Sequence, residues 1–172
     1  MSEAQSLEQR QLRLTRLMQT HGNSVLRVCF LYLHDRDLAQ DAAQTTFLNV
    51  WKALDSLRDD EHCRPWLMRI AVNTCRSVLR SRQYRQYAAH CNLDSIPEPG
   101  VCDQYPDHTV LNAVQGLPDK YREVVVMHYY QGLTTLETAQ ALRLPHATVR
   151  TRLHRARHML EPLLKGWYQS DA

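Results

Sequence analysis

Apolar side chains recur along the chain at the three- and four-residue spacing of helices, and no useful length alternates as a strand would. In the first segment Leu7, Leu14, Leu17 and Met18 follow this spacing, and a second apolar run covers residues 25–33. The polar stretch at 21–23 contains Gly22, so we expect a break between two helical segments there.

The next helix is predicted to begin after a capping Asp35 or Asp37 and to end near Leu54. Its expected inner stripe is Leu38, Ala42, Thr45 and Leu48. A third helix is predicted from Pro65 to Tyr87, since proline suits the start of a helix. The last third of the chain predicts helices over 108–116, 119–131, 135–142 and 146–165. The stretch "EVVVMHYY" favours strands by composition, but it lies between a capped start and Gly132, so we predict helix.

Residues 91–107, "CNLDSIPEPGVCDQYPD", are rich in proline and acidic side chains, which is typical of a linker. The sequence therefore predicts an all-α protein of two small helical domains, residues 1–90 and 108–172, joined by a flexible acidic linker.

Charge is distributed unevenly around this linker, although the net charge is only +3. Residues 62–93 hold six arginines and no acid, and residues 138–160 hold five arginines and no acid. Two basic blocks indicate contact with a polyanion at two places; the alternative is two solvated helix faces.

The stretch "TTLETAQALRLPHATVRTRLHRARHML" has the spacing of a helix-turn-helix. Leu136, Ala139 and Leu142 are expected to face inward on its first helix, and Leu144–His146 to form the turn. The second helix has a core stripe at Val149, Leu153, Ala156, Leu160 and Leu163. Its outward positions are Arg150, Thr151, His154, Arg155, Arg157 and His158. Such a helix fits the major groove of DNA, where arginine bonds guanine edges or phosphates. A helical hairpin that packs against another protein is the alternative.

The stretch "RPWLMRIAVNTCRSVLRSRQYR" divides in the same way. Leu67, Ile70, Ala71, Thr74 and Val78 form its inward stripe. Arg69, Asn73, Arg76 and Arg80 form the opposite face, which can hold phosphates and contact a base edge. Trp66, Tyr84 and Tyr87 are either stacking surfaces for single-stranded DNA or core residues. The earlier stretch "LAQDAAQTTFLNVWKAL" has one acid, Asp41, and predicts either a partner-binding helix or an ordinary core helix.

Five cysteines without a CxxC pair, no secretory signal and no apolar run of about 18 residues predict a cytoplasmic protein with free thiols and no membrane insertion. No nucleophile–base constellation, phosphate-binding glycine loop or metal motif is present in the sequence, so we expect no enzyme activity, no cofactor and no metal.

Four stretches together resemble the extracytoplasmic-function (ECF) sigma factors, the small two-domain members of the sigma-70 family. They are "DRDLAQDAAQTTFLNVWKAL", "RPWLMRIAVNTCRSVLRS", "LPDKYREVVVMHYYQGLTTLETAQAL" and "ATVRTRLHRARHML". The resemblance implies a monomeric protein that binds the β′ and β subunits of core RNA polymerase, recognises promoter DNA and is controlled by an anti-sigma factor.

By the same resemblance, Asp41, Gln44 and Phe47 match the segment that docks on β′. Arg69, Asn73, Arg76 and Arg80 match the helix that holds the −10 element, and the loop 58–64 before it matches the place where a flipped base is captured. Thr148, Arg150, Thr151, His154, Arg155 and Arg157 match the positions that contact the −35 element. The usual acidic places hold Gln40 and Thr45 here, which lowers the negative charge at the docking segment. An operator-binding regulator and a sigma-like decoy are the competing functions; the first is disfavoured because the sequence shows no dimerisation segment.

Overall fold

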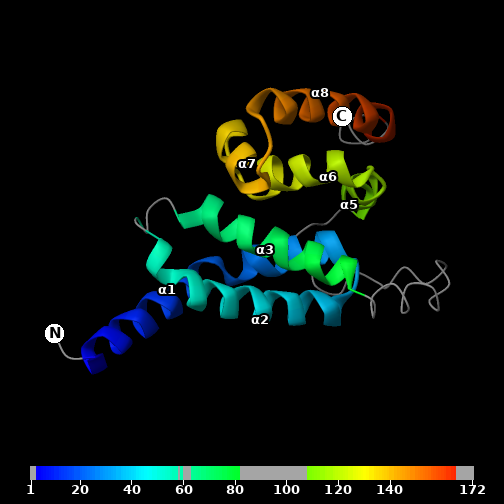
Figure 1. The fold of residues 1–172 in the computed structure, drawn as a ribbon. Helices are drawn as coiled ribbons and strands as arrows, with labels where there is room; N and C mark the ends of the chain where they lie inside the picture. The colour runs from blue at the N-terminus through cyan, green and yellow to red at the C-terminus, as the bar shows by residue number, and fades with distance from the viewer. Residues whose placement is uncertain (1–2, 58, 60–62, 82–107, 166–172) are drawn as a thin grey trace. The chain divides into compact units, whose positions relative to one another are not determined.

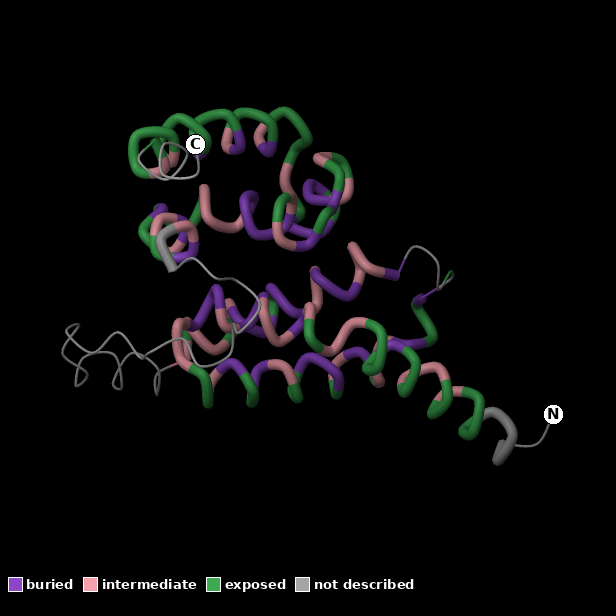
Figure 2. The backbone as a smooth tube through the Cα atoms, turned by 180° about the vertical axis from the view of Figure 1, so that it is seen from behind, coloured by how far each residue is buried: buried purple, intermediate pink, exposed green. Residues whose placement is uncertain are grey.

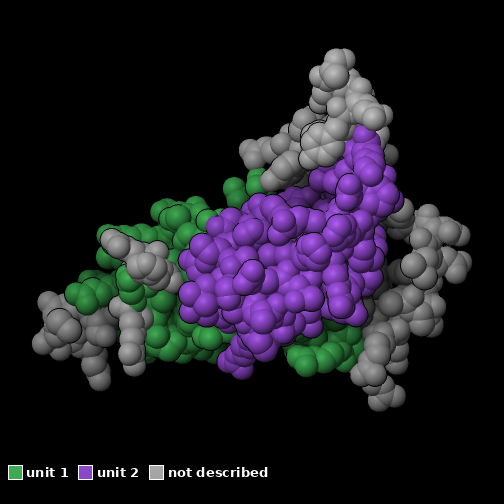
Figure 3. Space-filling view, turned by 90° about the horizontal axis from the view of Figure 1, so that it is seen from above, with its two compact units in different colours: residues 1–98 green, residues 99–172 purple. Residues whose placement is uncertain are grey.

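The computed structural model describes the chain except residues 1–2, 58, 60–62, 82–107 and 166–172 (Figure 1). The chain divides into two compact units, residues 1–98 and 99–172 (Figure 3). Every regular element among the described residues is a helix, which confirms the predicted all-α class.

The first unit consists of α1 (Glu3–Leu33), α2 (Arg36–Ala53), a short 3₁₀ turn η1 (Leu54–Ser56) and α3 (Cys63–Arg80). The three long helices pack on one another and share one apolar core. Fully buried side chains from each of them fill this core: Val25, Val28, Cys29, Val50, Leu67 and Ala71. Burial of these stripes, rather than helix propensity alone, stabilises the helices.

The predicted break at residues 21–23 is wrong, because α1 is continuous through Gly22. A glycine inside a helix costs only about 1 kcal/mol relative to alanine. Leu17 and Val25 are both buried on either side of it, so core packing outweighs that cost. Leu7 and Met18, by contrast, are about half exposed.

Helix α2 begins where the sequence indicated, since the Asp35 side chain accepts a hydrogen bond from the Leu38 N–H at 2.9 Å. Its inner face differs from the expected stripe: Thr45 and Leu48 are exposed, and of the predicted positions only Ala42 is buried. The buried residues are Ala39, Ala42, Thr46, Phe47 and Val50. The true face lies about one residue further round the helix, a rotation that small and mixed side chains did not reveal.

Helix α3 begins at Cys63, two residues before the predicted start, so Pro65 lies in the first turn, where its missing N–H is tolerated. Leu67, Ala71 and Thr74 are buried as predicted, whereas Ile70 and Val78 are only half-buried. Beyond Ser81 the predicted helix and the predicted linker lie outside the described residues.

The second unit contains α5 (His108–Gln115), α6 (Asp119–Val125), a π-helical turn η2 (Val126–Tyr130), α7 (Thr135–Leu142) and α8 (His146–Leu164). The stretch "EVVVMHYY" is therefore helical as predicted. Gly132 follows with a φ of 63°, a left-handed conformation that glycine adopts without strain.

Helices α7 and α8 lie where the helix-turn-helix was predicted, with helix bounds within one residue of those expected. Thr134 and Glu137 make a capping box at the start of α7, where the Glu137 N–H donates to Thr134 Oγ1 at 3.2 Å and the Thr134 N–H donates to Glu137 Oε2 at 2.8 Å. Arg143 ends α7 with a φ of 54°, and Pro145 precedes α8.

Two of the predicted core leucines in this motif lie outside the core. Leu136 is 57% exposed, because the buried face of α7 is formed by Thr138, Ala139, Ala141 and Leu142. Leu163 is 58% exposed, because α8 continues past the last buried position, Ala156. Val149, Leu153 and Ala156 are buried as predicted.

Candidate nucleic-acid interface

One side of α8 is exposed along its whole length, as the green outer side of this helix shows (Figure 2). The exposed side chains include all but one of the positions expected to contact DNA: Arg150, Thr151, His154, Arg155 and Arg157. Thr148 is half-buried. Because Val149, Leu153 and Ala156 are held in the core, this basic side is fixed outward, and four arginines on one 19-residue helix carry no neighbouring acid until Glu161.

Three histidines extend this surface. The His154 and His158 rings meet edge to face with centroids 4.5 Å apart, and His158 Nδ1 lies 3.8 Å from a Glu161 carboxylate oxygen. His146 at the helix start lies 2.8 Å from the Thr135 hydroxyl on α7. These contacts orient the rings beside the arginines, and an imidazole can donate or accept a hydrogen bond.

Helix α6 contributes residues to the same surface that sequence reasoning missed. A hydrogen bond from the Arg155 guanidinium lowers the pKa of the Tyr121 hydroxyl, and the charge of Lys120 adds to that effect. The Lys120 ammonium also lies 5.0 Å from the Tyr121 ring centroid, and Arg152 donates to the Lys120 carbonyl at 3.5 Å. Only the tertiary fold brings these residues together, since 34 positions separate Tyr121 from Arg155 in the sequence.

The predicted outward face of α3 is also present in the first unit. Asn73 and Arg80 are exposed, and Arg69 and Arg76 are half-exposed. The Arg80 side chain donates from Nε to the Arg76 carbonyl at 3.1 Å, which holds its guanidinium along the helix. Trp66 is half-buried, which is compatible with stacking on DNA and with core packing alike. Tyr84 and Tyr87 lie outside the described residues. The face can therefore present three arginines and one amide to a polyanion.

On α2 the structure separates the three residues predicted to contact a partner protein. Asp41 and Gln44 are exposed, together with Gln40 and Thr45. Phe47 is only 8% exposed and lies on the inner face, so it does not share the exposed surface of Asp41 and Gln44. Leu48, at 62% exposure, is the apolar side chain that this surface offers instead.

The cysteines that the structure describes, Cys29, Cys63 and Cys75, are buried free thiols, as expected. A hydrogen bond with Cys29 and burial both raise the pKa of the Cys75 thiol. Cys91 and Cys102 lie outside the described residues. Within the described ranges, no three His, Cys, Asp or Glu side chains are grouped so that they could hold a metal ion. None of the described helices is long and apolar enough to cross a membrane.

Comparison with known proteins gives matches to both units. The family model for sigma-70 region 2 matches residues 17–85, and the model for sigma-70 region 4 matches residues 108–160. The RNA polymerase sigma-H factor of Pseudomonas aeruginosa is 28% identical over 167 residues, which cover 87% of this chain and 86% of that protein. The ECF RNA polymerase sigma factor SigW of Bacillus subtilis is 27% identical and covers 87% of each chain.

Solved structures are also similar. CnrH, solved in complex with the cytosolic domain of CnrY, is 27% identical with a TM-score of 0.67, and the match covers 95% of this chain and 94% of that one. The sigma factor RpoE of Bartonella quintana, solved with the anti-sigma factor NepR, is 22% identical with a TM-score of 0.74, covering 88% and 96%. The second match bears on the fold alone.

Proposed function

This chain belongs to the sigma-70 family as an ECF-type factor, and on that premise we propose that it binds core RNA polymerase and directs it to promoters with −35 and −10 elements. The observation that carries the proposal is the pairing of two family regions, in order, with an exposed basic helix face in each. As a polymerase subunit, the chain acts in the cytoplasm and contributes binding rather than catalysis.

Helix α8 is proposed to contact the −35 element through its exposed arginines, with Thr148, Thr151 and His154 beside them. A helix of this kind enters the major groove with its N-terminal half toward the bases, while arginines further along contact phosphates. We assign Arg150 and Arg155 to base edges and Arg157 to a phosphate, since Arg157 lies two turns after Arg150.

Helix α3 is proposed to hold the −10 element through Arg69, Asn73, Arg76 and Arg80. Arginines bind the phosphates of the separated strand, and the Asn73 amide can both donate to and accept from a base edge. This division of work between the units allows each to recognise one short element of the promoter.

The exposed side of α2 around Asp41, Gln44 and Leu48 is proposed to dock on the β′ subunit. Leu48 is 62% exposed among these polar residues, and burying it against a partner would remove apolar area from water. We therefore expect Leu48→Ser to weaken core binding by about tenfold with little effect on stability. The matched control is Leu12→Ser, which alters an equally exposed leucine on α1. Equal core affinities of the two variants would contradict this assignment.

Control by an anti-sigma factor is part of the proposal, and its support is the similarity to CnrH, which was solved in complex with the cytosolic domain of CnrY. Such a partner would hold the two units away from polymerase until a signal releases them.

The deciding experiment is run-off transcription with purified core polymerase and a genomic fragment library, with and without the full chain. Discrete new transcripts that share upstream motifs are expected. Core binding without such transcripts would favour a decoy, and DNA binding without core binding would favour an operator-binding regulator.

A further inference from the structure

Helix α1 contacts both residues that bracket the segment between η1 and α3. At the first end, the Arg13 guanidinium donates to the Leu57 carbonyl at 2.7 Å and to the Leu54 carbonyl at 3.4 Å. At the second end, His21 Nε2 lies 3.5 Å from the Cys63 thiol sulfur, at the first residue of α3. One helix therefore holds Leu57 and Cys63, and residues 58–62 join them.

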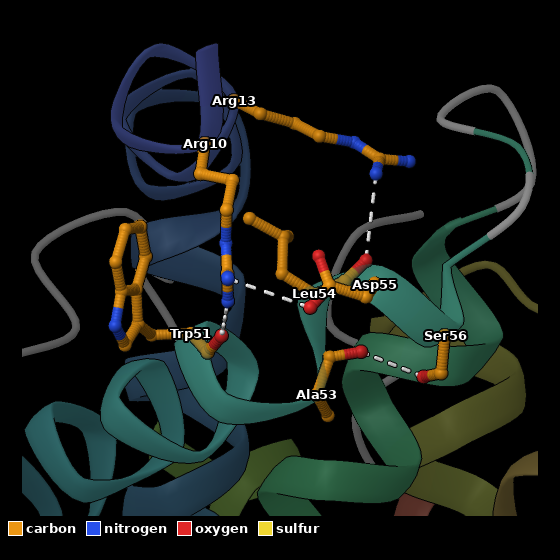
Figure 4. Close-up of polar contacts among 7 residues, drawn as sticks. All are labelled: Arg10, Arg13, Trp51, Ala53, Leu54, Asp55 and Ser56. Carbon is orange, nitrogen blue, oxygen red and sulfur yellow. Dashed lines mark hydrogen bonds and ion pairs between the residues drawn. The ribbon is translucent and has the colours of Figure 1, made fainter. Parts of the chain in front are cut away.

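A second arginine reinforces the first end (Figure 4). Arg10 donates to the Trp51 carbonyl at 3.2 Å, pairs with Asp55 at 3.4 Å and lies 4.8 Å from the centroid of the Trp51 ring. The last carbonyls of a helix lack onward partners within it and carry partial negative charge, so cations there are stabilising. Arg10 and Arg13 thus fasten the end of α2 and η1 to α1 through charged donors.

The contact at the second end is protected from water. Cys63 is 3% exposed and His21 is half-buried. Burial, together with the positive charge of Arg64, lowers the pKa of His21. The imidazole is therefore neutral at pH 7 and forms a neutral hydrogen bond with the Cys63 thiol. A neutral hydrogen bond in a buried place is costly to leave unmade.

We propose that Arg13 and His21 are positioning residues for promoter recognition: by holding Leu57 and Cys63, they fix where α3 begins and how its DNA-facing side is turned. Arg69 and Asn73 follow Cys63 by six and ten residues, within the first three turns of α3. A helix whose first turn shifts or rotates carries these side chains with it. The inference rests on the proposed function and adds α1, which carries none of the residues assigned to DNA, to the determinants of −10 specificity.

The first measurement is amide hydrogen exchange on the full chain for Arg13→Ala and His21→Ala, with Arg16→Ala as the control. Arg16 is an exposed arginine on the same helix, so its loss changes the charge as much as Arg13→Ala does without removing a contact at either end of the segment. Exchange at Leu57 should rise about tenfold in Arg13→Ala, and exchange in the second turn of α3, whose amides are the first to be bonded within that helix, should rise in His21→Ala. Arg16→Ala should match the wild type, and unchanged exchange in both test variants would overturn the proposal.

The second measurement is binding of each holoenzyme to fork-junction DNA that carries a −10 sequence recovered in the run-off assay and its single-base variants. The wild type should bind the recovered sequence more tightly than its variants, and this preference should be about tenfold smaller in Arg13→Ala. The affinity for core polymerase and the loss of affinity caused by a −35 substitution should stay unchanged. Arg13→Lys, which keeps one charged donor, should recover part of the preference.

These readouts separate positioning from a general loss of stability, since a merely destabilised unit would lose core affinity and −10 preference together. Raised exchange with an intact −10 preference would overturn the proposal, because α1 would then be structural only. If the wild type itself showed no preference for any −10 sequence, the proposed function would be wrong, and this inference, which rests on it, would be wrong as well.

Discussion

At the residue scale, the arginines of α8 differ in their contacts within the protein in the absence of DNA. Both Arg150 and Arg155 are exposed, but the Arg155 guanidinium lies near the Tyr121 hydroxyl of α6 and lowers its pKa. A side chain that is already oriented loses less freedom on binding. Residue-scale chemistry in this protein therefore depends on neighbours from other helices as much as on the residue itself.

Arg150→Ala and Arg155→Ala should each weaken promoter binding by about 1–3 kcal/mol if both read bases. Fluorescence anisotropy of the holoenzyme on promoter DNA measures the loss, and Lys165→Ala, beyond the last residue of α8, serves as the charge-matched control. Unchanged affinity in both arginine variants would show that the recognition face is placed wrongly.

Acid should destabilise the first unit through His21. Its folded-state pKa is lowered below 6.5, so at pH values below 6.5 the unfolded chain binds the proton more readily than the folded one. Stability from this group is therefore present at pH 7.5 and decreases as the pH falls below 6.5 toward the lowered folded-state pKa. Urea unfolding followed by tryptophan fluorescence should show a larger acid-induced loss for the wild type than for His21→Gln. Equal losses would exclude His21 as the source.

At the element scale, the helix ends are set by a few local devices. The Asp35 cap, the capping box of Thr134 and Glu137, and Gly132 all act where the sequence indicated or allowed them. Arg143 is different, because a non-glycine residue with a left-handed backbone is strained. The left-handed backbone at Arg143 thus costs a small amount of folding free energy, which other interactions of the folded unit offset.

Replacing Arg143 by glycine should relieve this strain. Arg143→Gly is expected to be more stable than Arg143→Ala by about 1 kcal/mol, since both remove the side chain but only glycine adopts the observed φ freely. Thermal unfolding of the two variants side by side measures the difference, and a more stable alanine variant would contradict it.

At the scale of the whole molecule, basic helix faces occur in both compact units. Under the proposed function, both faces contact one promoter at once. Each phosphate contact releases counterions from DNA, so binding that uses both units should depend steeply on salt.

The salt dependence of holoenzyme binding tests this joint contact. Arg76→Ala in α3 and Arg157→Ala in α8 should each reduce the slope of log K against log salt by about 1, and the double variant by about 2. Arg16→Ala on α1 should leave the slope unchanged. A double variant with the slope of a single one would indicate that the two units do not bind the same DNA molecule together.

Helix order, the helix-turn-helix and the outward sides of α3 and α8 were predictable from the sequence, because local spacing and capping chemistry determine them. Four stretches also sufficed to indicate the family, since their order and separation can be read directly from the sequence. The inner face of α2 was not predictable, because Thr45 and Leu48 fit an apolar stripe as well as Ala39 and Thr46 do. Leu136 and Leu163 were not predictable either, because spacing alone does not show which face of α7 is buried or how far along α8 the buried positions extend.

The sequence by itself determined which helices form and which of them carry positive charge, because both follow from residues close together along the chain. Tertiary structure alone decided the continuity of α1 through Gly22, the burial of Phe47 and the contacts of Arg13, His21 and Tyr121. Those outcomes depend on packing between residues tens of positions apart, and the free energy of such packing cannot be estimated from a local sequence pattern.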